Sequence, residues 1–408
     1  MREFNDRLIE FIDSSPTPFH AVENMVKVLL DRGFKRLYEE DDWNLYDGGY
    51  FVVRNDSSII IFTYPYESGY VMVGAHTDSP NLKLKPNPIT KTAGVSRFGV
   101  EPYGGVLLNP WFDRDLALAG RVVVVDGGKR VQKFINIKKP LAFIPSLAIH
   151  LDRDANKSKS INAQSDILPI ISNGDIDFEE LMLSYSGGEK LLSHELLLYD
   201  IQGGSYIGDD FIASARLDNL LSCFVGLNAI VDTKYPMLCS FMDHEEVGSD
   251  SIAGAGGNFL EEVLRKITKD DFLKTMRKSV MISCDNAHAL HPNFPSKHDE
   301  NHAPILNDGV VIKINANQRY ATNATTEALF RECSDELNLP TQSFITRSDM
   351  GCGSTIGPIT ATKLGVDTID VGVAQLAMHS IREICGAKDT YRLYQTLREI
   401  GRFHGNIS

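Results

Sequence analysis

Several apolar runs in this sequence end abruptly in histidine and acidic residues. The run MLCSFM is followed by Asp243, His244, Glu245 and Glu246, so that one imidazole and three carboxylates crowd together. Like charges this close repel each other and shift each other's pKa, so the cluster needs either water or a neutralising partner. A bound cation would neutralise the carboxylates, and one of the paired glutamates would then be available to accept a proton.

The same pattern recurs elsewhere in the chain. YVMVGA is followed by His76 and Asp78, SVMISC by Asp285, and DTIDVGV, after five further residues, by His379, while Asp218 lies near the start of the predicted helix RLDNLLSCFVGLNAIV. Histidine and carboxylate ligands without clustered cysteines suit zinc or a similar divalent ion. Any one of these residues could be an ordinary polar loop residue or helix cap, but their recurrence at five positions favours a metal site.

The fold must bring these distant residues together. From residue 214 onward, predicted helices alternate with short apolar runs, which is typical of an α/β domain with a largely parallel sheet. Ligands of such sheets bind outside the carboxyl ends of the strands. We therefore expect the histidine and acidic residues to meet along one edge of the sheet.

In the middle of the chain, helical periodicity is rare and strand patterns dominate. GRVVVVDGGKRVQKFINI predicts two strands joined by a turn at Gly127–Gly128. The predicted fold is an α/β domain with a central mixed, largely parallel sheet flanked by helices. Residues 1–88 and 212–408 form this domain, and a β-rich insert domain at 89–211 interrupts it.

Composition narrows the classes of function. The 408 residues carry a net charge of −13 and a pI near 5.3, which argues against nucleic-acid or anionic-membrane binding, because phosphate recognition needs clustered Lys and Arg. The N-terminus lacks the apolar core of a signal peptide, and no stretch reaches the roughly 20 apolar residues of a membrane span. The six cysteines are scattered without a CxxC pair. These features predict a protein of the reduced cytoplasm.

Common catalytic signatures do not occur. The sequence has no HExxH metalloprotease helix, no GxxxxGK[ST] phosphate loop and no GxSxG nucleophile elbow. The histidine-rich stretch 286–302 contains prolines and is predicted to be a loop whose histidines are mostly structural. One of them, His288, is a candidate substrate contact.

Taken in order, the motifs resemble a known family. GAHTDSPNLKLKP, WFDRDLALAGRV, RLDNL, HEEVGS, CDNAHALHPN, NQRYATNA and QLAMHSIRE together resemble the aspartyl aminopeptidase family of dinuclear metallo-aminopeptidases. The motifs run from residue 74 to 383, so the resemblance covers nearly the whole chain. Each motif alone is weak, whereas the ordered set is specific.

The resemblance implies roles for individual residues. One metal ion would be bound by His76 and Asp285, the other by Glu246 and His379, with Asp218 bridging them. Glu245 would be the general base and acid, and Asp78 would orient the imidazole of His76 through its free ring nitrogen. Candidate substrate contacts are His150, which would reach a neighbouring subunit's site, Lys313, near an acidic substrate side chain, and His288. Lys313 could equally well be a solvated lysine on a strand, and His150 could equally well be a structural histidine.

The implied activity is removal of the N-terminal residue, with Asp or Glu as one preference, from short peptides. Two divalent ions per subunit are implied, zinc first and cobalt or manganese as alternatives, in dimers that assemble into a homo-dodecamer through the insert. Asn286 stands where eukaryotic relatives carry Met. This difference would affect the preference for acidic N-terminal residues, not the hydrolysis itself. The alternatives are a dinuclear deacylase of small N-acyl compounds, a non-catalytic assembling scaffold and a peptide-binding module.

Overall fold

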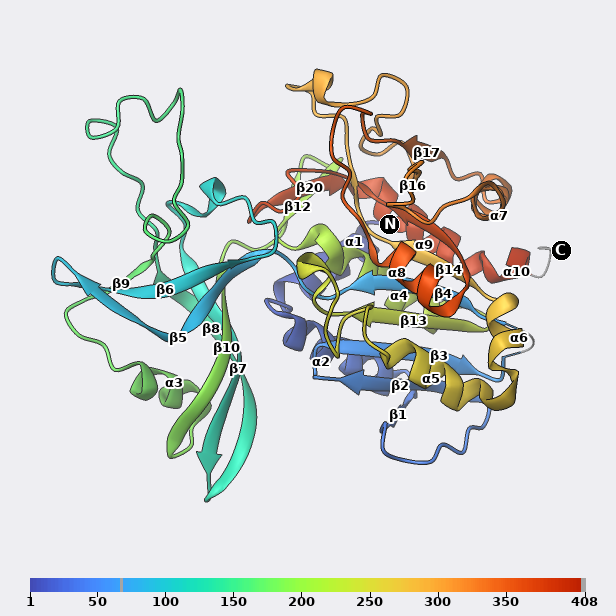
Figure 1. The fold of residues 1–408 in the computed structure, drawn as a ribbon, viewed down its shortest axis with the longest axis horizontal. Coiled ribbons are helices and arrows are strands. Elements are labelled where there is room, and N and C mark those ends of the chain that lie inside the picture. The colour runs from blue at the N-terminus through green and yellow to red at the C-terminus, as the bar shows by residue number, and fades with distance from the viewer. Residues whose placement is uncertain (67–68, 405–408) are drawn as a thin grey trace. The chain divides into compact units, whose positions relative to one another are not determined.

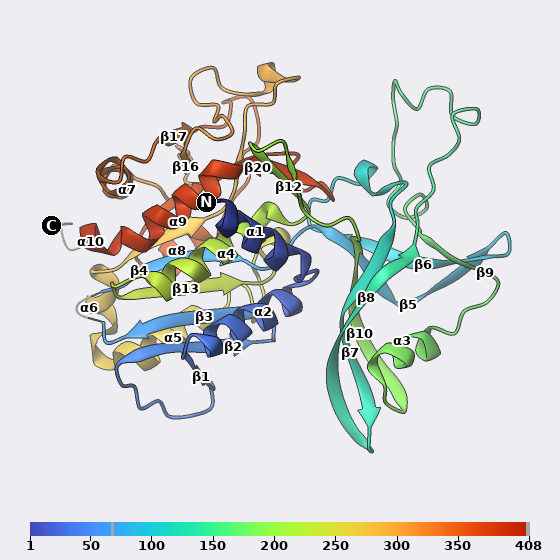
Figure 2. The ribbon, with the colours of Figure 1, turned by 180° about the vertical axis from the view of Figure 1, so that it is seen from behind.

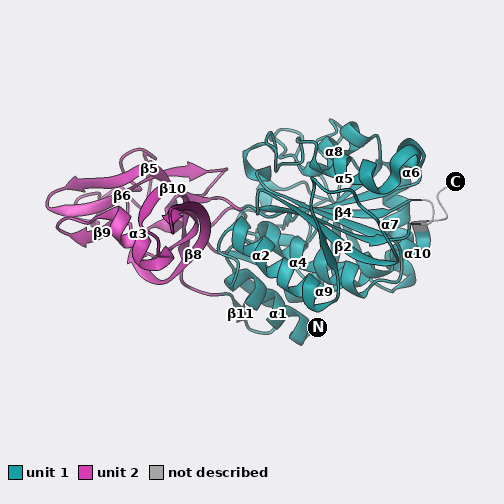
Figure 3. Ribbon diagram, turned by 90° about the horizontal axis from the view of Figure 1, so that it is seen from below, with its two compact units in different colours: residues 1–78, 204–378, 383–408 teal, residues 79–203, 379–382 magenta. Residues whose placement is uncertain are grey.

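The computed structural model describes residues 1–66 and 69–404. The chain divides into two compact units, one of residues 1–78, 204–378 and 383–408 and one of residues 79–203 and 379–382 (Figure 3). These limits differ from the predicted insert at 89–211. The second unit begins earlier because β5 (Asn81–Thr92) pairs within its sheet, and it ends earlier because β12 (Phe211–Ser214) pairs with a strand of the first unit.

The first unit is organised around a nine-stranded mixed sheet (Figure 1). Its strands, in spatial order, are β1 (Lys35–Leu37), β2 (Gly48–Arg54), β3 (Ser58–Tyr64), β13 (Met237–Met242), β4 (Val71–His76), β14 (Val280–Cys284), β18 (Asp367–Gly372), β16 (Val310–Lys313) and β17 (Thr341–Phe344). The central strands β13, β4, β14 and β18 are parallel to one another. Together with the flanking helices, this sheet confirms the predicted fold class.

Helices cover both faces of this sheet, and the two hydrophobic cores lie beneath them. One face carries α1 (Arg2–Asp13), α2 (Pro18–Asp31), α4 (Leu217–Asp232), α7 (Ala324–Glu336) and α9 (Ala387–Glu399), followed by the short α10 (Gly401–His404) (Figure 2). The opposite face carries α5 (Phe259–Thr268), α6 (Phe272–Arg277) and α8 (Ile356–Leu364). The central strands are therefore buried on both sides, as their continuous apolar runs require.

Close packing fixes β4 at one particular position. A Cβ atom at Gly74 would lie 2.2 Å from the Cε atom of Met281 in β14 and 2.9 Å from Cδ1 of Ile356 in α8. A larger residue at this position would require the ends of both side chains to shift. Two residues further along, β4 ends at His76.

A smaller five-stranded sheet also belongs to the first unit. It consists of β11 (Ser205–Ile207), β12, β20 (Glu383–Gly386), β19 (Ala374–Leu376) and β15 (Ala287–His288). It joins the segment that follows the insert to the segment that follows β18.

The second unit contains a six-stranded antiparallel sheet. Its strands, in spatial order, are β8 (Lys129–Ala142), β7 (Leu116–Asp126), β10 (Lys190–Asp200), β5, β6 (Val95–Tyr103) and β9 (Ile170–Asn173), with α3 (Phe178–Ser186) packed against β8 and β10. Gly127 and Gly128 both have positive φ and join β7 to β8, so the predicted hairpin turn is confirmed.

None of the helices in residues 1–66 and 69–404 has both the length and the apolar character needed to cross a bilayer. All six cysteines are free thiols, and Cys352 alone among them is not fully buried.

Candidate metal centre

Parallel pairing brings three polar segments to one edge of the large sheet. In register, Met242 at the end of β13 pairs with His76 at the end of β4, and β14 runs parallel to β4 on its other side. The loops that follow these strands therefore leave the sheet at the same edge. Asp285 follows β14, and Glu245 follows β13.

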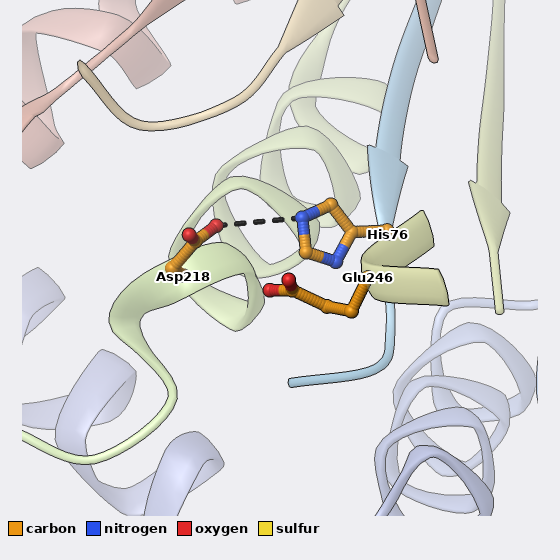
Figure 4. Close-up of side chains that lie close together, drawn as sticks. All are labelled: His76, Asp218 and Glu246. Atoms are coloured by element: carbon orange, nitrogen blue, oxygen red, sulfur yellow. Dashed lines mark ion pairs between the residues drawn. The ribbon is translucent and has the colours of Figure 1, made fainter. Parts of the chain in front are cut away.

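His76, Asp218 and Glu246 form a compact group of possible metal ligands (Figure 4). One ligand atom from each residue lies within 4.8 Å of the other two. The Nε2 atom of His76 is 3.4 Å from Oδ1 of Asp218, and both side chains are buried. One imidazole nitrogen and two carboxylates form a donor set that suits zinc or a similar ion.

Irregular backbone conformations aim these side chains. Asp218 lies in the first turn of α4 with non-helical φ and ψ values of −84° and 104°, after Arg216 with a φ of 55°. Glu245 and Glu246 begin a 3-10 turn, Glu245–Val247, that lies between two residues with left-handed conformations, His244 and Gly248. In an extended strand, adjacent side chains point to opposite faces. In this turn both glutamates reach His76, since Oε2 of Glu245 is 3.9 Å from its Nε2 atom.

Asp78 connects the histidine to both glutamates. Its Oδ1 atom accepts a hydrogen bond from the backbone N–H of Glu245 and its Oδ2 atom accepts one from Glu246, each at 3.1 Å. Oδ1 also lies 3.4 Å from Nδ1 of His76, and the backbone carbonyl of Asp78 is 3.0 Å from the same nitrogen. Acceptors around Nδ1 favour the tautomer that keeps the Nε2 lone pair facing Asp218.

The electrostatics show how strongly these carboxylates are crowded. Burial raises the pKa of Glu245 to about 8; the charge of His76 acts in the opposite direction, and the negative charges of Asp285, Asp78 and Asp218 add to the increase. Burial and the charge of Asp218 also raise the pKa of Glu246 well above its usual value. A dication among these groups would replace the bound protons and remove the repulsion. The residues therefore fit a metal ion.

Lys313 lies beside this group and is only 2% exposed, so it is not a solvated strand lysine. Its Nζ atom is 3.4 Å from Oδ2 of Asp285 and donates a hydrogen bond of 3.1 Å to the backbone carbonyl of Asn286. Burial raises the pKa of Asp285, and Lys313 opposes that shift.

Other histidines of the chain have the following surroundings. His379 belongs to the second unit, where its Nδ1 atom is 3.1 Å from the backbone carbonyl of Gly105. His150 belongs to the same unit and is exposed. His244 is 2.8 Å from the hydroxyl of Ser251 through its Nδ1 atom, so it takes no part in the His76 group.

His288 is exposed on β15 and lines a pocket of about 460 Å³ in the first unit. The rest of the wall comes from β17, β19 and the loops around them. Its lining includes three histidines, two basic side chains and several apolar ones, among them His291, His298, Lys297, Arg347, Phe294 and Phe344.

The sequence reasoning missed Glu383. This buried carboxylate on β20 accepts a hydrogen bond of 3.0 Å from the backbone N–H of Asp218 through its Oε2 atom. It lies opposite Ser214 of β12, shortly before the turn that carries Asp218. Its only sequence signal is an acidic residue at the end of the motif QLAMHSIRE.

Comparisons with known proteins agree with this fold and site. A family model described as aminopeptidase I zinc metalloprotease (M18) matches residues 11–400. The probable M18 family aminopeptidase 2 of Pseudomonas syringae pv. syringae is 49% identical over 418 residues, covering 97% of each chain.

Two solved structures also resemble this chain in fold. The cryo-EM structure of an Ape4 and Nbr1 complex has a TM-score of 0.94 and 37% identity, covering 99% of this chain and 86% of that chain. The mApe1 dodecamer of S. cerevisiae has a TM-score of 0.87 and 27% identity, covering 99% and 98%. With a family match over nearly its whole length, this chain belongs to the M18 family of zinc metalloprotease aminopeptidases.

Proposed function

We propose that this metallo-aminopeptidase binds two divalent ions, zinc first, and uses Glu245 as its general base. His76 and Asp285 would hold one ion, Glu246 and His379 the other, and Asp218 would lie between them. The observation that carries the proposal is the buried group of His76, Asp218 and Glu246, with ligand atoms within 4.8 Å of one another. Bound dications would polarise the scissile carbonyl and lower the pKa of a water from 15.7 toward roughly 7.

Glu245 is the group proposed to move the proton. Its carboxylate lies 3.9 Å from His76 Nε2 and is mostly shielded from solvent. As a water oxygen attacks the carbonyl carbon, a water proton passes to a carboxylate oxygen of Glu245. That proton then passes to the departing amine nitrogen as the peptide C–N bond breaks.

Two other acidic residues are proposed to hold this machinery in place. Asp78 fixes the turn that carries both glutamates, and Glu383 fixes the backbone at Asp218. Errors of about 1 Å in such positions cost roughly 100-fold in rate, so these contacts matter for catalysis even though neither residue needs to touch substrate.

The proposed substrates are short peptides with a free N-terminus, and acidic N-terminal residues are the proposed preference. Support comes from the pocket that His288 lines, whose wall carries Lys297, Arg347 and two further histidines. Arg347 is paired with Asp349, which reduces its contribution to the positive charge. His288, His150 and Lys313 are the proposed substrate contacts.

A homo-dodecamer is the proposed assembly, because one solved relative is described as a dodecamer. The antiparallel second unit, with its exposed His150, would supply contacts between subunits. Light scattering tests this, and a monomer at micromolar concentration would contradict both the assembly and the role of His150.

A panel of chromogenic aminoacyl substrates tests the activity. Asp, Glu, Leu, Lys and Ala derivatives, each with a free or acetylated amine, are assayed with zinc, cobalt and manganese. We expect turnover of the free amines only. Release of acetate from the acetylated compounds, without release of the chromophore from the free amines, would show a deacylase instead.

The Glu245→Gln variant tests the base. We expect it to fold and bind metal but to lose activity by about 10³-fold or more. Normal turnover with confirmed metal content would exclude Glu245 as the base.

A further inference from the structure

Two buried amides, those of Asn286 and Gln375, link the residue after Asp285 to the pocket that His288 lines. The Nδ2 group of Asn286 donates hydrogen bonds to the backbone carbonyl of Leu217 at 2.9 Å and to Oε1 of Gln375 at 2.6 Å. A carbonyl can only accept, so Asn286 must present its NH₂ group to Leu217. The same NH₂ group then faces Gln375, which must present its own carbonyl oxygen in return.

In this arrangement Asn286 contacts the carbonyl oxygen of the Gln375 side chain and not its NH₂ group. Its Nε2 group has no hydrogen-bond partner in residues 1–66 and 69–404, although the side chain is only 1% exposed. Burying a donor without an acceptor is costly, so nearly all such groups in proteins are paired with protein, water or a ligand. The position of Gln375 indicates which of these applies.

Gln375 lies in the wall of the pocket beside His288, and its partner Asn286 directly follows the candidate ligand Asp285. Gln375 and His288 are paired in register on the parallel strands β19 and β15, and both line the pocket. Apolar side chains, including Phe294, Phe344 and Met378, form much of the remaining lining. A ligand with an apolar stem and an oxygen acceptor at its end would match this wall.

We infer that Gln375 recognises the substrate, donating a hydrogen bond from Nε2 to an oxygen acceptor in the side chain of the N-terminal residue. The class of substrate is a peptide whose first side chain carries a carboxylate or a carboxamide. Asn286 is the positioning residue that holds the Gln375 amide in the required orientation. Because Nε2 is buried, the proposed contact requires a neighbouring pocket side chain to move aside. This inference rests on the proposed aminopeptidase function.

Two variants of Gln375 and three substrates test it. Gln375→Leu removes the donor, and Gln375→Glu keeps an acceptor toward Asn286 while replacing the donor with a second oxygen. Asp, Asn and Leu p-nitroanilides are compared by kcat/KM. We expect Gln375→Leu to lower kcat/KM for Asp and Asn by about 10- to 100-fold, as loss of one hydrogen bond to a polar or charged group would do. The Leu substrate should change by less than about threefold.

Gln375→Glu makes a sharper distinction. It should repel the Asp substrate and retain the Asn substrate, whose NH₂ group can donate to the new oxygen. Equal losses on all three substrates, or unchanged selectivity in both variants, would overturn the inference. Melting temperatures show that each variant is folded, and if Gln375→Leu does not fold, Gln375→Glu alone decides. If the wild-type protein cleaves none of the three substrates, the proposed function itself fails, which separates the two outcomes.

Discussion

The contact between Asp78 and the two glutamates leads to a quantitative prediction for Asp78→Asn. The change keeps the shape of the side chain but replaces one of two oxygens, each 3.1 Å from a backbone nitrogen, with an NH₂ group. One hydrogen bond to a charged acceptor is lost, worth about 1.5–3 kcal/mol, and a half-buried N–H of the turn then faces another donor. We take about 2–4 kcal/mol as the loss of restraint on the turn.

That loss converts directly into a rate. At 1.36 kcal/mol for each factor of ten, the productive position of Glu245 becomes populated about 30- to 1,000-fold less often. We therefore expect kcat to fall by that factor in Asp78→Asn. KM should change much less, because Asp78 is not expected to touch substrate.

The assay is steady-state kinetics on an aminoacyl p-nitroanilide, with metal content measured by elemental analysis on the same samples. Asp243→Asn is the matched control, since Asp243 is also buried in this loop but bonds the backbone N–H of His244 instead. We expect it to stay within about tenfold of wild type. Wild-type kcat in fully metallated Asp78→Asn, or an equal loss in Asp243→Asn, would refute the reasoning.

Three further predictions concern metal binding. Asp218→Ala should lose both ions together, and full stoichiometry by elemental analysis would contradict a bridging role. Glu383→Gln, which weakens the acceptor for the Asp218 N–H, should lower metal affinity by about 10- to 100-fold in a chelator competition, and unchanged affinity would leave Glu383 a purely structural residue. In the metal-free protein the pKa of Glu245 is raised from 4.5 to about 8, so its contribution to folding stability is present below pH 4.5 and is lost as the pH rises to about 8. Over the same pH range the affinity for metal should increase, because metal binding expels the proton from Glu245. Calorimetry in two buffers of different ionisation enthalpy should detect the released proton. An affinity that does not depend on pH would contradict the raised pKa.

The sequence predicted those parts of the structure that depend on local pattern. Continuous apolar runs correctly identified β4, β13 and β14 as buried strands. Because parallel strands end at a common edge, the same runs also predicted that His76 would lie near the residues after β13. A period-two pattern with a Gly-Gly turn was enough for the β7–β8 hairpin.

Features that depend on distant pairing could not be predicted. The contact of Glu383 with Asp218 arises from antiparallel pairing of β12 with β20, two segments well separated along the chain. The hydrogen bonds from the backbone of Glu245 and Glu246 to Asp78 depend on a 3-10 turn that begins after His244, a residue with a left-handed conformation. Neither helix propensity nor periodicity in the sequence predicts such a turn. The strand pattern of β5 does not indicate which sheet it joins, so its place in the second unit follows only from its pairing with β6 and β10.

The wide spacing of the candidate ligands along the chain has a consequence for how the protein acquires its metal. His76, Asp218 and Glu246 become neighbours only after α4 and the strands on both sides of β4 are in place. These three ligands therefore come together only in the folded protein, unlike those of a zinc finger, which are close in sequence. Capture of the ion follows folding, so protein produced in metal-depleted medium should be loaded afterwards by simple addition of the salt, without a refolding step.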